Sequence, residues 1–174
     1  MSDRPKGKIV TRPDGEPVAR VGPIAHIGLV VKDADKTAEL YSRLFGIEFE
    51  VDDYDMTKGK FFNVDGQPQK ARFRAAFGQA GAVAIELVEV LEGETPHTRF
   101  LGRHGEGMQH LCFYVTDMQD TMARLNAAGI RAILDYEFET TYDGKRSRIQ
   151  ETYLSTNELL GGATIQLLQV DPLD

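Results

Sequence analysis

The sequence predicts an α+β fold made of two tandem modules, each a strand, a helix and then two or three antiparallel strands. The segment HIGLVVKD, which begins at His26, is written again as HLCFYVTD at His110, with an Asp seven residues after each His. A segment of helical periodicity follows both copies, and each copy closes with an apolar strand pattern. An internal repeat of this kind indicates a duplicated supersecondary unit.

The composition indicates one globular domain of ordinary size. The chain has 174 residues, of which 41% are hydrophobic and 27% charged, and its net charge is −7. No apolar run approaches the ~20 residues that span a bilayer, and the N-terminus lacks the apolar segment of a signal peptide. The single cysteine, Cys112, excludes an internal disulfide. We therefore expect a cytoplasmic protein without a membrane partner, and the acidic balance argues against nucleic-acid binding.

The chain divides into an arm and one domain. Residues 1–20 are polar, with scattered charge, Pro and Gly, and are interpreted as a flexible N-terminal arm. The domain is expected to cover 21–174. Within it, module one spans about 22–92, a linker helix about 95–104 and module two about 106–170.

The elements of module one follow from local patterns. In IAHIGLVV, every second residue from Ala25 to Val31 is aliphatic, so an extended segment has one fully aliphatic face, which predicts a strand. KDADKTAELYSRLFGI has helical spacing; Asp33 or Asp35 can cap its start, and Gly46 stands where a left-handed residue ends a helix. Two further strands are expected at residues 71–78 and 82–90.

The linker and module two are read in the same way. Thr95 followed by Pro96 predicts the start of a short helix. His97 and His104 flank this helix and are expected at the surface. A helix is expected in MQDTMARLNAAGI, with Gly129 in the role of Gly46, and strands are expected at residues 148–155 and 161–169.

Four polar residues stand in four otherwise apolar strands. His26 and His110 occupy matched positions of the repeat, and so do Glu86 and Gln166. Their neighbours are apolar or small, and side chains alternate across a sheet, so all four are expected on the face opposite the helices. Two imidazoles, one carboxylate and one amide oxygen suit a divalent ion such as Zn, Co, Ni or Mn. The quartet therefore predicts a metal site.

From Ile24 to about Leu168 the sequence resembles the vicinal-oxygen-chelate superfamily, which includes glyoxalase I, extradiol dioxygenases, bleomycin and fosfomycin resistance proteins and methylmalonyl-CoA epimerase. The segments IELVEV and FLGRHGEGMQH look most like the epimerase family. The resemblance implies two βαβββ modules that form a curved mixed sheet, a half-barrel around a metal site with the helices on the outside. It also implies a homodimer and a small-molecule substrate, and its ligand positions fall on His26, Glu86, His110 and Gln166.

The resemblance implies a metal-dependent epimerase or isomerase that acts on an acyl-CoA-type substrate through a metal-stabilised enolate. Glu86 is the only carboxylate of the quartet and the best candidate for the base. Glu151 is a weaker candidate, expected on a solvated strand face. Arg74 is expected to face the metal side and hold an acidic group of the substrate, with Tyr153 lining the pocket.

Two departures from the epimerase pattern stand out. The last ligand position is usually Glu in that family and in glyoxalase I, but here it is Gln166, whose amide cannot exchange protons near neutral pH. The family also places a catalytic Glu on the middle strand of module one, where this chain has Arg72 to Arg74 and no carboxylate.

Three other functions are consistent with parts of the pattern. A glyoxalase I-like lyase (lactoylglutathione lyase) would use the same metal chemistry on a thiol conjugate. An extradiol-type dioxygenase would need two His and one carboxylate on iron, with the carboxylate at the last position in the relatives. A non-catalytic small-molecule binder would have little use for the metal quartet.

Overall fold

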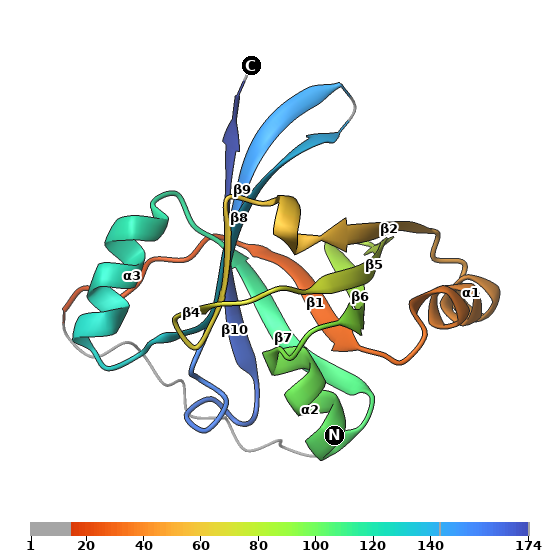
Figure 1. Cartoon of the computed structure of the whole chain (residues 1–174), viewed down its shortest axis with the longest axis horizontal. Helices are drawn as coiled ribbons and strands as arrows, with labels where there is room; N and C mark the ends of the chain where they lie inside the picture. Colours follow the sequence, from red (N-terminus) through yellow and green to blue (C-terminus); the bar gives the residue numbers. More distant parts are fainter. Residues whose placement is uncertain (1–14, 143, 174) are drawn as a thin grey trace, which may run out of the picture.

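A computed structural model describes residues 15–142 and 144–173. Most of the predicted N-terminal arm, residues 1–14, lies outside this range. Both modules belong to one ten-stranded mixed sheet that curls around a concave interior; of its three α-helices, two pack on the outer face and the linker helix lies against the interior (Figure 1). The α+β fold of two tandem modules predicted from the repeat, and the half-barrel that the resemblance implies, are therefore confirmed.

Module one and the linker helix contain the first strands and helices of the chain. The elements in chain order are β1 (Ile24–Val30), α1 (Ala34–Phe45), β2 (Phe49–Asp55), the 3-10 helix η1 (Met56–Lys58), β3 (Phe61–Val64), β4 (Gln67–Pro68), β5 (Arg72–Ala80), β6 (Val83–Glu92) and α2 (Pro96–His104).

Module two repeats the pattern with a longer hairpin. Its elements are β7 (Gly107–Tyr114), α3 (Met118–Ala127), β8 (Ala132–Tyr142), β9 (Lys145–Leu154) and β10 (Thr164–Pro172). The long β8–β9 hairpin and the end of β10, which pairs with β9, extend together beyond the other strands (Figure 1).

The two modules are related by the central pair of strands. The sheet order is β2-β5-β6-β1-β7-β10-β9-β8-β3-β4. β1 pairs antiparallel with β7, and each of them pairs parallel with the last strand of its own module, β6 or β10. The short strand β3 leaves module one and pairs with β8 at the far edge. The sheet is thus continuous within one chain, and one chain supplies all four predicted ligand positions.

The helices begin at the predicted caps, and α1 ends at the predicted glycine, but the C-terminal cap of α3 lies one residue before Gly129. The Asp33 carboxylate accepts a hydrogen bond from the first turn of α1, and Gly46 ends that helix in the left-handed region with φ 70°. Thr95 caps α2 through a capping box. In α3 the cap is Ala128, and Gly129 follows it with φ 84°.

Three clusters of buried side chains form the core. One lies beneath α1, around Leu87, and another lies beneath α3, around Leu167. The third, around Phe73 and Tyr153, fills part of the concave interior. Each module therefore buries its outer face under one helix and leaves its inner face for the interior of the half-barrel. Among the described residues, no helix is long and apolar enough to cross a membrane.

Candidate metal centre and active site

Strand register brings the predicted ligands into two adjacent rows across the sheet. In one row, Gly28 of β1 lies between Glu86 of β6 and His110 of β7. In the next row, Cys112 of β7 lies between His26 of β1 and Gln166 of β10. Paired residues on neighbouring strands point to the same face, so all four ligand side chains enter the concave interior.

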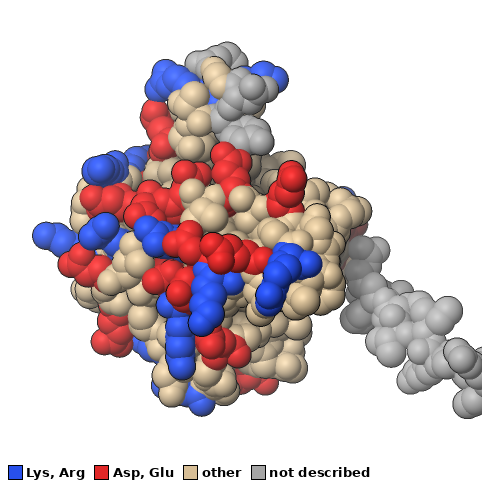
Figure 2. Space-filling model, turned by 90° about the vertical axis from the view of Figure 1, so that its right-hand side faces the viewer, with Lys and Arg blue, Asp and Glu red and all other residues tan. Residues whose placement is uncertain are grey.

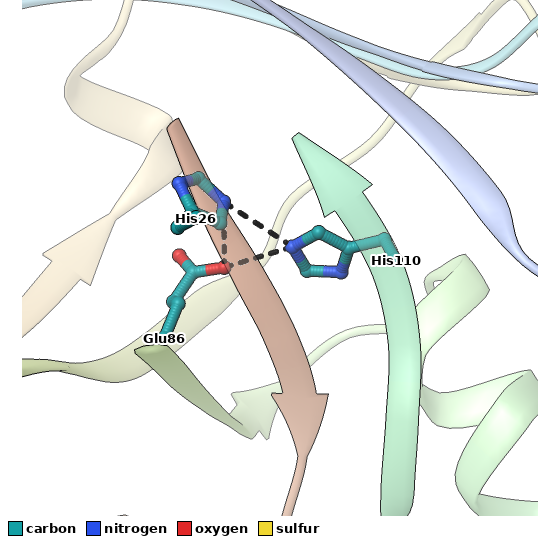
Figure 3. Close-up of side chains that lie close together, drawn as sticks. All are labelled: His26, Glu86 and His110. Carbon is teal, nitrogen blue, oxygen red and sulfur yellow. Dashed lines mark hydrogen bonds and ion pairs between the residues drawn. The ribbon is translucent and has the colours of Figure 1, made fainter. Parts of the chain in front are cut away.

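Three of these side chains converge on one point (Figure 3). His26 Nε2 and His110 Nε2 lie 3.3 Å apart; Glu86 Oε2 lies 3.3 Å from the first and 3.0 Å from the second. Gln166 Oε1 lies 2.8 Å from His26 Nε2. An ion with bonds of about 2.1 Å holds neighbouring ligand atoms roughly 3.0–3.4 Å apart. The donor set and its spacing therefore fit a divalent cation.

Glycine at position 28 makes the convergence possible. A Cβ added to Gly28 would lie 1.9 Å from His110 Nε2, so any larger residue would displace the imidazole. On its other side, His110 Nδ1 lies 2.8 Å from Gln109 Oε1. Because an amide oxygen only accepts, Nδ1 carries the proton, and Nε2 presents its lone pair to the cluster.

The charges of the cluster are strongly coupled. Burial opposes charge on His26, but the Glu86 carboxylate and the neighbouring Cys112 together outweigh it and raise the His26 pKa to about 11. Burial likewise opposes ionisation of Glu86, yet His26 and His110 hold its pKa far below its usual range. Burial lowers the pKa of His110. The cluster without an ion is therefore an imidazolium–carboxylate pair beside a neutral imidazole.

A cavity of about 80 Å³ adjoins the cluster and is lined by Glu86 together with aromatic and aliphatic side chains. Tyr153, predicted to line the pocket, is 1% exposed there, with its ring centroid 5.0 Å from that of His110. Of the described residues that line this cavity, none is Lys or Arg.

Arg74 does not face this cavity, and the prediction that it does is wrong. Register pairs Phe77 with Glu86, so Phe73, Ala75 and Phe77 point inward, and the arginines of β5 point outward. Arg74 there donates to Asp53 and Asp35 at 2.7–3.2 Å. The face that carries α1 shows interspersed acidic and basic side chains (Figure 2). The alternation along β5 was predicted correctly, but its inward face was misassigned.

Glu151 lies in the cavity, not on the solvated strand face that we expected. Its carboxylate accepts short hydrogen bonds from Tyr136 Oη and Gln166 Nε2. Burial, together with the negative charge of Glu86, raises the pKa of Glu151 to about 7. The signal was present in the sequence, because Glu151 alternates with Tyr153 and therefore shares its face.

His97 was also misplaced by the prediction. It is 2% exposed and lines the same cavity, whereas His104 is exposed as expected. Its position three and four residues before Phe100 and Leu101 puts it on the inner face of α2, which is the signal that could have found it. Burial, aided by His110, lowers the pKa of His97 to about 3, so the imidazole is neutral.

Comparison with known proteins places the chain in a superfamily. The profile of the Glyoxalase/Bleomycin resistance protein/Dioxygenase superfamily matches residues 25–148, and the chain belongs to this superfamily. Its members are mostly enzymes and typically bind a divalent metal.

Individual relatives are more distant. The chain is similar to methylmalonyl-CoA epimerase from Mycobacterium tuberculosis, with 23% identity, a TM-score of 0.57, and coverage of 90% of this chain and 93% of that one. A Streptomyces coelicolor methylmalonyl-CoA epimerase variant in complex with 2-nitronate-propionyl-CoA has 20% identity and a TM-score of 0.59, with coverage of 86% and 98%. The uncharacterized protein YqjC of Bacillus subtilis is 24% identical over 108 residues, 62% of this chain and 68% of that protein. At these identities the solved structures establish the fold.

Proposed function

We propose that this protein is a metal-dependent epimerase or isomerase that moves the α-proton of an acyl-CoA-type carbonyl compound through an enolate. His26, Glu86, His110 and Gln166 would hold one divalent ion. When bound, such an ion polarises a carbonyl oxygen and stabilises the negative charge that develops on it.

The observation that carries this proposal is the presence of two carboxylates with opposite pKa shifts around one cavity. Glu86 stays ionised between two imidazoles, which suits a ligand. Glu151 has a pKa of about 7, which suits a group that takes up and returns a proton near neutral pH. Epimerisation removes a proton from one face of the α-carbon and returns it on the other. We infer that Glu151 exchanges the proton on one face. Glu86, the base predicted from sequence, would serve the other face by detaching from the ion, because a carboxylate held as a ligand cannot take up the proton.

The placement of these carboxylates accounts for both departures from the epimerase pattern. Glu151 pairs with Leu168, two residues after Gln166, while Ala75 pairs with Val88, two residues after Glu86. Glu151 and Ala75 are therefore equivalent positions in the two modules. The family pattern has a carboxylate on the middle strand of module one and another at the last ligand position, in module two; here Glu151 lies on the middle strand of module two, and Glu86 is the ligand carboxylate of module one. Exchanging the two repeated modules converts one arrangement into the other, so one ligand carboxylate and one carboxylate for proton exchange are available in both.

The cavity supports a small acyl group. Its volume of about 80 Å³ accommodates only a few heavy atoms, and Tyr153 and the other aromatic side chains form its walls. The thioester tail of an acyl-CoA would lie outside the cavity. The proposal needs no cationic side chain within the cavity, because an ion in the cluster would face the substrate oxygens.

The test is exchange of the α-proton of methylmalonyl-CoA in D2O by protein loaded with one equivalent of Co²⁺ or Zn²⁺, followed by NMR. Wild-type protein should catalyse exchange, and Glu151→Gln should lower the rate at least ~10²-fold with metal content unchanged. Glu139→Gln, at an exposed carboxylate on β8 that pairs with Arg146, is the matched control and should be active. Absence of exchange by the loaded wild-type protein would contradict the proposal.

One observation favours a second candidate. His26, His110 and Glu86 form a cluster of two histidines and one carboxylate, a set that non-haem iron(II) oxygenases use. Consumption of O2 by Fe²⁺-loaded protein with a catechol, without proton exchange on methylmalonyl-CoA, would favour a dioxygenase.

A homodimer and a cytoplasmic location stay predictions. Size-exclusion chromatography with light scattering would test the first, and cell fractionation the second.

A further inference from the structure

The side chain of His97 is the most unusual group in the cavity. Neither Nδ1 nor Nε2 has a hydrogen-bond partner among the described residues, and only 2% of the residue is exposed. Leaving a buried polar atom without a partner costs free energy, and each such atom in a folded protein calls for an explanation.

Packing does not explain a histidine at this position. The ring of His97 makes edge contacts with Phe73, Tyr153 and His110, at centroid separations of 5.6, 5.1 and 6.0 Å. A phenylalanine would make similar ring contacts without burying two polar nitrogens. The start of α2 does not require the imidazole either, because the capping box of Thr95 and Thr98 satisfies the backbone there.

Metal binding does not explain it either. The described side chains whose ligand atoms lie mutually within 4.8 Å are His26, Glu86 and His110, and His97 is outside this group. It nevertheless lines the same cavity as Glu86 and Glu151. The partners that remain for its nitrogens are a water or a ligand bound in that cavity.

We propose that His97 is a specificity-determining residue that hydrogen-bonds an oxygen on the short acyl arm of the substrate. This rests on the proposed function, because the substrate carbonyl at the metal cluster defines which end of the substrate enters the cavity. Apart from Glu86 and Glu151, the other residues that line the cavity are apolar or aromatic, including Met56, Phe73 and Val88. The favoured substrate class is therefore a carbonyl compound with a short arm that bears a hydroxyl, keto or carboxyl oxygen, in preference to a plain alkyl arm.

The first test uses the metal-free protein and requires no substrate. If His97 is retained for binding, His97→Leu and His97→Phe should unfold at the same urea concentration as the wild type or at a higher one. His104→Leu, at the exposed histidine of the same helix, is the matched control. A clear fall in the unfolding midpoint of both His97 variants would show a structural role and overturn the inference.

The second test compares two metal-chelating probes that differ only in the end of the arm. Glycolohydroxamate ends in a hydroxyl where propionohydroxamate has a methyl. In the Co²⁺-loaded wild type, glycolohydroxamate should bind at least ~10-fold more tightly, because a site with a polar partner rejects the arm that lacks one. His97→Leu should lose this preference without loss of metal, and His97→Asn should retain part of it.

Equal affinity of the two probes for the wild type, or an unchanged preference in His97→Leu, would contradict the role of His97. If neither probe binds and the protein does not retain Co²⁺, the result would count against the proposed metal site instead. In that case the urea measurement alone decides the inference about His97, so the two failures are distinguishable.

Discussion

Metal uptake should release a proton, because the metal-free cluster holds one on His26. The pKa of this imidazole is about 11, raised by Glu86 against the effect of burial. An ion can bind His26 Nε2 only after that proton leaves. Each pH unit below the pKa costs about 1.4 kcal/mol, so at about pH 8 displacement costs roughly 4 kcal/mol. The apparent affinity for metal should therefore rise about tenfold per pH unit between about pH 8 and about pH 9.

The assay is calorimetric titration of Co²⁺ into metal-free protein in buffers of different ionisation enthalpy, above the pKa of Glu151, which is about 7. Close to one proton should be released per ion bound. Glu86→Gln keeps the shape of the side chain but removes the charge that raises the His26 pKa. In this variant burial dominates, His26 is neutral, and proton release should fall toward zero along with the pH dependence. Release of no proton by the wild type, or the same release by Glu86→Gln, would refute this account of the cluster.

Three further outcomes are expected. Gly28→Ala should weaken metal binding at least ~10-fold, because the new Cβ occupies the space of the His110 ring, whereas Gly102→Ala, whose Cβ meets open space, should bind normally in the same titration. The raised pKa of Glu151 means that its contribution to metal-free stability falls as the pH rises from 4.5 to about 7; in urea denaturation Glu151→Gln should therefore gain up to about 3 kcal/mol over the wild type at about pH 8 and nothing near pH 4. Thr95→Ala should lower stability by about 1 kcal/mol through loss of the α2 cap, and an unchanged unfolding midpoint would argue against that cap.

The fold was predictable from sequence because the same pattern of a strand, a helix and further strands occurs twice in the chain. A period of two in the strands, an Asp at the start of α1 and of α3, and Gly46 after α1 are local signals, and the structure follows them. β2 at one edge of the sheet, and β8, β3 and β4 toward the other edge, were not located individually. β2 is mostly exposed, so it lacks the apolar pattern on which a strand prediction depends.

The sequence predicts the site residues that the repeat places in matched positions. It does not predict residues whose orientation depends on how the strands pair. His26 and His110 were placed by the repeat alone. Which face of β5 points inward depends on its pairing with β6, a long-range contact that alternation along β5 cannot reveal, and this is why Arg74 was misassigned. Glu151 and His97 were assigned to solvent because burial of such groups is uncommon. Both are exceptions of the kind expected at a functional site.

The position of a bound ion tests the central claim most directly. Crystals of protein loaded with one equivalent of Co²⁺ would give it from anomalous scattering at the cobalt edge. We predict one peak per chain, about 2.1 Å from Nε2 of His26, Nε2 of His110 and a carboxylate oxygen of Glu86, with Gln166 Oε1 as the fourth protein ligand. A peak elsewhere on the chain, or none at full loading, would contradict the assignment of this cluster as a metal centre.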